Sequence, residues 1–166
     1  STSYASMGYS LPAAIGAYVA SKKPTYSFNG DGGIQMNIQE LNAVAKNNYP
    51  IKIFVLNNHA LGNITSFQDQ ICGGRYKATK ESGGEYFAAP FIEVAKAYGI
   101  RAVKLETPED ITKYSEELID DKPILFEIEL DDNEPAGPNI VCGGNLLTSA
   151  TPIPEDDANA IRRILD

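Results

Sequence analysis

Along the chain, segments whose apolar residues have helical spacing alternate with short runs typical of β-strands. Short β-favouring runs predict four strands, over residues 24–29, 51–56, 101–105 and 123–130. Apolar residues at helical spacing predict four helices, over 10–19 with a Ser10 cap, 38–45 with an Asn37 cap, 91–98 and 107–119. Regular alternation of helices and strands is typical of a three-layer α/β fold, in which a mostly parallel sheet carries helices on both faces.

Two stretches interrupt this alternation. Residues 57–89 contain several glycines and one short helical pattern at 64–70, and a loop of this length in a compact domain is usually functional. Residues 131–154 are rich in Pro and Gly and predict a tail over the surface, followed by a short helical pattern from Ala158 to Leu165. We therefore expect a domain over 1–130 and a tail over 131–166 that packs on it.

Composition narrows the class of protein. The chain has 166 residues, the length of one ordinary domain, and a net charge of −8 without a large basic cluster, which argues against nucleic acid as a partner. The sequence has no membrane-length apolar run and no secretory signal pattern, so we expect a cytoplasmic protein.

The two cysteines, Cys72 and Cys142, are far apart in the sequence, so we expect both to be free thiols. The chain begins at Ser1, which suggests a fragment of a larger protein.

Polar residues follow two of the predicted strands where chemistry is expected. Asp31 comes just after the first strand, and Asn57-Asn58 come just after the second. In a right-handed βαβ unit the carboxyl ends of both strands lie at one edge of the sheet, where open α/β sheets place their ligands. The two motifs are therefore expected to meet.

Their chemistry favours a metal bound to phosphate. Carboxylate, amide and carbonyl oxygens suit Mg²⁺, which takes few protein carboxylates and completes its shell with phosphate oxygens and water. Gly30, Gly32 and Gly33 leave room for backbone N–H groups to approach a phosphate. The Walker pattern is absent, and a dinucleotide fingerprint that starts at Gly30 would need glycine in place of Gln35. The ligand that these residues still favour is a diphosphate bound to a metal ion.

At this point the residues resemble the thiamine-diphosphate-dependent enzymes, whose signature is Gly-Asp-Gly, some two dozen residues, then Asn-Asn. Here 24 residues, Gly33 to Leu56, separate Gly32 from Asn57. Segments 6–17, 37–41 and 54–58 are similar to the acetolactate synthase and pyruvate oxidase branch. The resemblance runs over about 1–130 and implies the thiamine-diphosphate-binding fold, with thiamine diphosphate and Mg²⁺ as cofactors.

The resemblance also implies a role for each matching residue, and none of these roles is catalytic. Metal ligands would be Asp31, the Asn58 side chain and the Ala60 carbonyl. Diphosphate oxygens would be held by Gly32 and Gly33 beside Gly30, with Leu61, Gly62 and Asn63 closing over them. The aminopyrimidine ring would be contacted by Met7 and by the backbone of Ala5 and Ser6.

Two further points concern the whole enzyme. Acetolactate synthases usually carry Met-Val and a Trp where this chain has Asn63-Ile64 and Phe67, which leaves open an acetolactate-synthase-like enzyme of other substrate range. The glutamate that activates the cofactor lies, in this family, on a pyrimidine-binding domain from a neighbouring subunit. The resemblance therefore implies a homo-oligomer that acts on a 2-oxo acid, with this chain inactive by itself.

Alternatives remain at this stage. The chain could be a non-catalytic α/β assembly or regulatory module without cofactor, or the β subunit of another thiamine-diphosphate-dependent oxidoreductase. His59 is the only histidine, and we expect it to be an exposed loop residue without a fixed role. Glu81 is expected to be a solvated charge.

Overall fold

The computed structural model describes residues 6–131, 155–157, 159 and 163, and it centres on a parallel sheet. The strands are β1 (Thr25–Gly30), β2 (Ile51–Asn57), β3 (Arg101–Leu105) and β4 (Ile124–Glu129), in the order β1-β2-β4-β3. The helices are α1 (Ser10–Ser21), α2 (Asp31–Gln35), α3 (Leu41–Asn47), α4 (Gly62–Cys72) and α5 (Phe91–Ala97). Three 3₁₀ segments are η1 (Ile38–Glu40), η2 (Glu81–Gly83) and η3 (Pro108–Tyr114).

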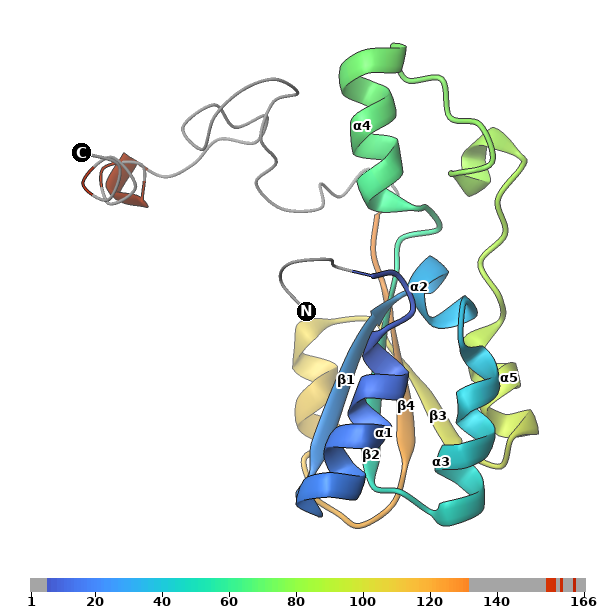
Figure 1. Ribbon diagram of the computed structural model, residues 1–166, viewed down its shortest axis with the longest axis vertical. Coiled ribbons are helices and arrows are strands. Elements are labelled where there is room, and N and C mark those ends of the chain that lie inside the picture. Colours follow the sequence, from blue (N-terminus) through green and yellow to red (C-terminus); the bar gives the residue numbers. More distant parts are fainter. Residues whose placement is uncertain (1–5, 132–154, 158, 160–162, 164–166) are drawn as a thin grey trace.

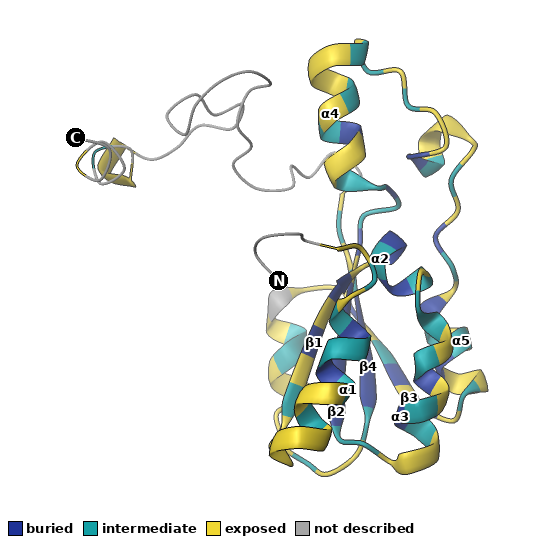
Figure 2. Ribbon diagram, in the orientation of Figure 1, coloured by how far each residue is buried: buried dark blue, intermediate teal, exposed yellow. Residues whose placement is uncertain are grey.

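Both faces of the sheet are covered, because β2 and β4 carry apolar side chains on each side. One face packs Ile53 and Val55 of β2 against α1, α3 and α5. On the opposite face Phe54 stacks on Phe126 with ring centroids 5.0 Å apart, and Tyr114 of η3 meets Phe126 edge-on. Figure 2 shows the buried residues concentrated on these strands. The predicted three-layer parallel α/β fold is confirmed.

The four predicted strands are present within a residue or two of their expected bounds, but several helical details differ. Ser10 is the first residue of α1 rather than its cap, and its hydroxyl lies 3.1 Å from that of Ser27. The side chain of Asn37 likewise makes no cap hydrogen bond. Helix α2 has no signal in the sequence, because Asp-Gly-Gly has low helix propensity and tertiary contacts impose the turn.

The third layer also differs from its prediction. The region expected to be a helix over 107–119 is a 3₁₀ segment followed by turns. Ile111 and Tyr114 are three residues apart, and a 3₁₀ turn places both on the sheet just as an α-helix would, so the apolar pattern does not distinguish the two.

The predicted surface tail over 131–154, the Ala158–Leu165 pattern and Cys142 lie almost wholly outside the described residues. Cys72 is a free thiol, as expected. No helix within the described part of the chain combines the length and apolar character needed to cross a membrane.

A buried cation joins the amino-terminal ends of β2 and β4. The Lys52 side chain is completely buried, and its ammonium donates to the Asp120 carboxylate at 2.5 Å and to the carbonyl oxygens of Lys122 and Asp120 at 2.6 and 3.1 Å. Such a group needs partners, because burying an unpaired ammonium costs several kcal/mol. The hydrogen bond from Lys52 lowers the pKa of Asp120 below 3.8.

We expect Asp120→Asn to lower the free energy of unfolding by about 1 kcal/mol at neutral pH, because Asp120 is partly exposed and solvent screens the pair. A depressed carboxyl pKa stabilises the fold above the unfolded value and loses that effect as the pH falls through the folded value. Urea unfolding of both proteins from neutral to acidic pH should show the difference shrink below pH 3.8. A pH-independent difference would contradict this account.

Gly8 makes the turn that leads into α1. Its φ is +81°, and a Cβ there would lie 2.6 Å from Met36 Cβ and 2.9 Å from Asn37 Nδ2. Asn37 Nδ2 also donates to the Gly8 carbonyl at 2.9 Å. The turn therefore requires glycine on steric and conformational grounds.

Gly8→Ala should destabilise the fold by about 2 kcal/mol or more. Gly16→Ala is the matched control, because Gly16 lies inside α1 with open space around it and should gain about 0.5–1 kcal/mol from helix propensity. Thermal unfolding of the two variants should move the midpoint in opposite directions.

Candidate functional site

A cleft of about 420 Å³ lies at the carboxyl ends of β1 and β2. Its lining comes from the segments where the chain leaves these strands and from the first turn of α4, which Figure 1 shows above the strand ends. Its described lining consists of Met7, Gly30, Asp31, Gly32, Gly33, Leu56, Asn58, Ala60, Leu61, Gly62, Asn63, Ile64 and Leu130. Asp31 is the one charged residue in this set.

Asp31 is held in a fixed orientation at the start of α2. The residue is almost fully buried, and its Oδ2 accepts hydrogen bonds from the Tyr86 hydroxyl at 3.0 Å and from the Ala60 N–H at 3.2 Å. Burial raises the pKa of Asp31 above 3.8, against the lowering effect of the Gly32 N–H, Tyr86 and Ala60. A bound cation would reverse this effect, because it favours the ionised carboxylate.

After β2 the chain turns at His59, whose φ is +53°, and Ala60 then forms an isolated bridge that directs its backbone toward the cleft. A short antiparallel bridge joins Ala60 to Lys80, with Leu61 N donating to Thr79 O at 2.8 Å and Glu81 N to His59 O at 2.9 Å. In this bridge the residues on either side of Ala60 make the hydrogen bonds, and the backbone groups of Ala60 itself point the other way, where its N–H donates to Asp31. The N–H and C=O of Ala60 therefore point away from residues 79–81 and toward Asp31 and Asn58.

Three polar groups meet at one point of the cleft. One terminal atom of the Asn58 amide lies 2.8 Å from the Ala60 carbonyl oxygen and 3.2 Å from Oδ1 of Asp31. With nitrogen at this position the amide donates to both oxygens; with oxygen there, three oxygen atoms face one another. Neighbouring ligand oxygens around octahedral Mg²⁺, at about 2.1 Å from the metal, lie about 3.0 Å apart. When the amide oxygen faces Ala60 and Asp31, these two separations match those between neighbouring ligands of Mg²⁺.

The glycines of the cleft serve different purposes. A Cβ at Gly32 would lie 2.3 Å from Leu61 Cδ2 and 3.0 Å from Met7 Cε, so these side chains already fill the space beside it. A Cβ at Gly30 or Gly33 would meet nothing within 4 Å. Gly30 and Gly33 therefore border the open part of the cleft, where a ligand has direct access to the backbone.

Asn57 and Asn58 differ in environment despite their adjacency. The Asn57 side chain is buried and donates to Glu127 Oε1 at 2.8 Å, while its Oδ1 accepts from the His59 N–H at 3.2 Å. Asn57 thus links the end of β2 to β4, and of the two asparagines only Asn58 faces Asp31.

His59 is half-buried and ion-paired, whereas the sequence led us to expect an exposed loop residue. His59 is half-buried with φ +53°, its Nδ1 lies 2.5 Å from Glu81, and its Nε2 contacts Glu129, which also pairs with Lys104 at 2.8 Å. Burial lowers the pKa of His59, but hydrogen bonds to Glu129 and Glu81 outweigh it and leave the pKa above 6.5. Glu81 is therefore an ion-pair partner rather than a merely solvated charge. The bridge ties the Asn58–Ala60 turn to η2 and to the end of β4.

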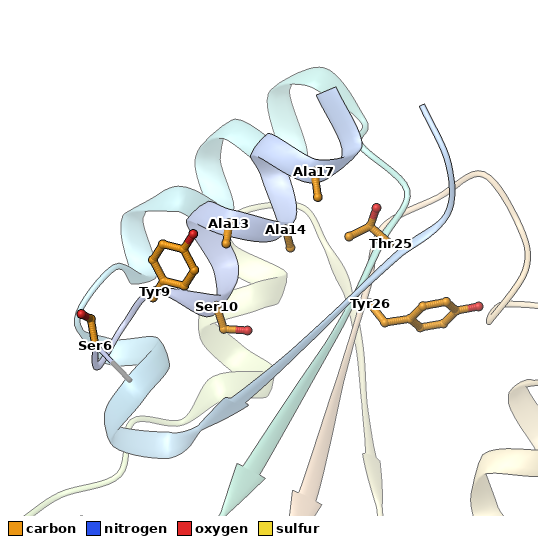
Figure 3. Close-up of a pocket in the computed structure, with 8 residues that line it drawn as sticks. All are labelled: Ser6, Tyr9, Ser10, Ala13, Ala14, Ala17, Thr25 and Tyr26. Carbon is orange, nitrogen blue, oxygen red and sulfur yellow. The ribbon is translucent and has the colours of Figure 1, made fainter. Parts of the chain in front are cut away.

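Most of the predicted site residues lie together in the cleft. These are Met7, Gly30, Asp31, Gly32, Gly33, Asn58, Ala60, Leu61, Gly62 and Asn63. Ala5 lies outside the described residues, and Ser6 lines a different groove. That groove, of about 500 Å³, runs between α1 and β1, and Figure 3 shows Ser6 and Tyr9 at one end and Tyr26 at the other. Its described lining carries no charged side chain.

Sequence reasoning missed Tyr86 and Gln35. Tyr86 reaches Asp31 from the long loop, and Gln35 Nε2 donates to the Tyr86 hydroxyl at 3.2 Å and to the Asp31 carbonyl at 3.2 Å. Burial raises the pKa of Tyr86, and Asp31 raises it further, so the hydroxyl stays protonated and donates. Tyr86 belongs to no motif and is 55 positions from Asp31, so no local pattern could have indicated it.

Comparison with known proteins agrees with this geometry. Residues 1–128 match the family model described as thiamine pyrophosphate enzyme, C-terminal TPP binding domain. The acetolactate synthase large subunit of Haemophilus influenzae is 33% identical over 156 residues, which are 92% of this chain and 26% of that protein. A probable acetolactate synthase large subunit of Methanococcus aeolicus is 37% identical over 129 residues, covering 75% of this chain and 20% of that protein.

A solved structure gives the same result. The thiamine diphosphate-dependent 4-hydroxybenzoylformate decarboxylase of Rhodococcus jostii superposes with a TM-score of 0.69 at 29% identity, over 77% of this chain and 24% of that one. The chain thus spans about a fifth to a quarter of these relatives. Domains of the matched family bind thiamine diphosphate together with Mg²⁺. The family match over most of the chain and the agreement in fold show that this chain belongs to the C-terminal thiamine-diphosphate-binding domains of the thiamine-diphosphate-dependent enzymes.

Proposed function

We propose that the cleft holds the Mg²⁺–diphosphate end of thiamine diphosphate, with Asp31 Oδ1, the Asn58 amide oxygen and the Ala60 carbonyl as the protein's metal ligands. The observation that carries this proposal is the meeting of these three groups, with separations of 2.8 and 3.2 Å. All three are hard oxygen donors, and only one is a carboxylate, which suits Mg²⁺ with phosphate and water completing the shell.

The charge of the cleft supports the same proposal. Its described lining carries one carboxylate and no cationic side chain, so an anionic diphosphate would meet repulsion from Asp31. A divalent cation between the two removes this repulsion. Backbone N–H groups beside Gly30, Gly32 and Gly33 then bind diphosphate oxygens, and Leu61, Gly62 and Asn63 border the ligand at the start of α4.

The chain's remaining contribution is to orient the cofactor. Bound thiamine diphosphate supplies an electron sink that lets a 2-oxo acid lose carbon dioxide. Met7 packs beside Gly32 and lines the cleft with its side chain half-exposed, so in this proposal it contacts the aminopyrimidine ring. Contacts from the Ala5-Ser6 backbone stay a prediction of the sequence. Met7 would position the ring without taking part in bond making.

We further propose that the whole protein is an acetolactate-synthase-like enzyme that decarboxylates and ligates 2-oxo acids. The support is the set of relatives named as acetolactate synthase large subunits. In this proposal a pyrimidine-binding domain from a neighbouring subunit of a homo-oligomer completes the site with its glutamate, and the present domain alone is inactive. The cytoplasmic location stays a prediction of the sequence.

Asp31→Ala in the full-length enzyme should raise the Mg²⁺ concentration for half-maximal thiamine diphosphate binding roughly 100-fold, because the site loses its only anionic ligand. Calorimetric titration measures this value, and carbon dioxide release from a panel of 2-oxo acids should fall in parallel. Asp69→Ala is the control, since Asp69 is exposed on α4 and contacts Tyr76 away from the cleft. Undiminished turnover by Asp31→Ala would refute the metal role.

Removal of the metal should have the same effect as loss of its ligand. We expect a chelator of divalent cations to weaken thiamine diphosphate binding by roughly 100-fold or more, because the diphosphate then faces the Asp31 carboxylate directly. Equilibrium dialysis with and without added Mg²⁺ measures the change. Metal-independent binding of unchanged affinity would overturn the proposed arrangement.

A further inference from the structure

The two carboxylate oxygens of Asp31 stand in different environments. Oδ2 receives two hydrogen bonds, from Tyr86 and from the Ala60 N–H, at 3.0 and 3.2 Å. Oδ1 lies 3.2 Å from the Asn58 amide, at the point where the three oxygen ligands are proposed to meet. Oδ2 is therefore held by Tyr86 and by the Ala60 N–H, whereas Oδ1 faces the Asn58 amide; the Gly32 N–H also donates to this carboxylate.

Tyr86 is itself held in the direction that this arrangement needs. Gln35 Nε2 donates to the Tyr86 hydroxyl oxygen, which occupies a lone pair and directs the hydroxyl hydrogen toward Asp31. The same nitrogen lies 3.2 Å from the Asp31 carbonyl, within the first turn of α2. Gln35, Tyr86 and Asp31 thus form a hydrogen-bond network that fixes the orientation of the Tyr86 hydroxyl and of the Asp31 carboxylate.

We infer that Tyr86 is a positioning residue for the metal: it holds Oδ2 of Asp31 out of the coordination shell, so that Asp31 binds through Oδ1 alone. This inference rests on the proposed function of the cleft. Single-oxygen coordination is compatible with the strict octahedral shell of Mg²⁺, whereas Ca²⁺ takes more ligands and often binds both oxygens of a carboxylate. Tyr86 therefore also favours Mg²⁺ over Ca²⁺.

Tyr86→Phe in the full-length enzyme tests this role, because it removes the hydroxyl and keeps the ring. We expect the Mg²⁺ concentration for half-maximal thiamine diphosphate binding to rise about five- to tenfold, as for loss of one hydrogen bond to a charged group. Excess Mg²⁺ should restore full binding, and the ratio of Mg²⁺ to Ca²⁺ affinity should fall. Calorimetric titration with each metal gives all three values.

The matched control is Tyr76→Phe, since Tyr76 lies in the same loop and its hydroxyl also contacts an aspartate, Asp69, outside the cleft. This control should leave both metal titrations unchanged. Gln35→Met is a second test that keeps Tyr86 itself, and it should shift the Mg²⁺ requirement in the same direction by a smaller factor.

The outcomes separate the inference from the function on which it rests. If the wild-type enzyme binds no thiamine diphosphate with Mg²⁺, the proposed function fails. If the wild type binds but Tyr86→Phe leaves the Mg²⁺ requirement and the metal ratio unchanged, the inference fails alone. A loss of binding that excess Mg²⁺ does not restore, with Gln35→Met unchanged, shows a purely structural role and also overturns the inference.

Discussion

The parallel pairing of β1 with β2 is the constraint on which the cleft depends. Their register places Gly30 opposite Leu56, so the residues that follow each strand leave the sheet side by side. Asp31 and Asn58 can then meet although 26 residues lie between them in the chain. The side chains of β2 pack into a different cluster on each face, so a one-residue slip would exchange two sets of packed side chains and move one group away from the other.

A second constraint comes from a part of the chain far from the motifs. The antiparallel bridge between Ala60 and Lys80 and the His59 contacts with Glu81 and Glu129 fix the turn after β2 from outside the cleft. Beside the cleft, the Tyr86 hydroxyl donates to Asp31 and fixes its orientation. The long loop thus takes part in building the site, although glycines and polar residues dominate its sequence.

The sequence was sufficient to predict those features that depend on local pattern and strand direction. The continuous apolar run from Ile51 to Leu56 indicated a strand buried on both faces, and parallel topology then brought Asp31 and Asn58 to one edge. Contacts between distant side chains could not be predicted in this way. Tyr86 and Gln35 have no spacing rule that links them, and the partners of His59 come from two segments that only the folded chain brings together.

The type and position of some helices likewise could not be predicted from local sequence pattern. Asp31–Gln35 is helical because the end of β1 and the packing of Ile34 impose it, against the preference of two glycines. The 3₁₀ segment at 108–114 and an α-helix would bury the same apolar residues, so periodicity could not separate them. Propensity and pattern lose predictive value where tertiary contacts decide the backbone.

The lack of cationic side chains in the described lining of the cleft has a thermodynamic consequence. In a site that contains a lysine or arginine, the affinity for a phosphate ligand depends little on the concentration of free metal. In the proposed arrangement Mg²⁺ and the diphosphate contact each other as well as the protein, so each raises the affinity for the other by the same factor. We therefore expect a fall in free Mg²⁺ to lower the occupancy of the cleft even at a constant concentration of thiamine diphosphate.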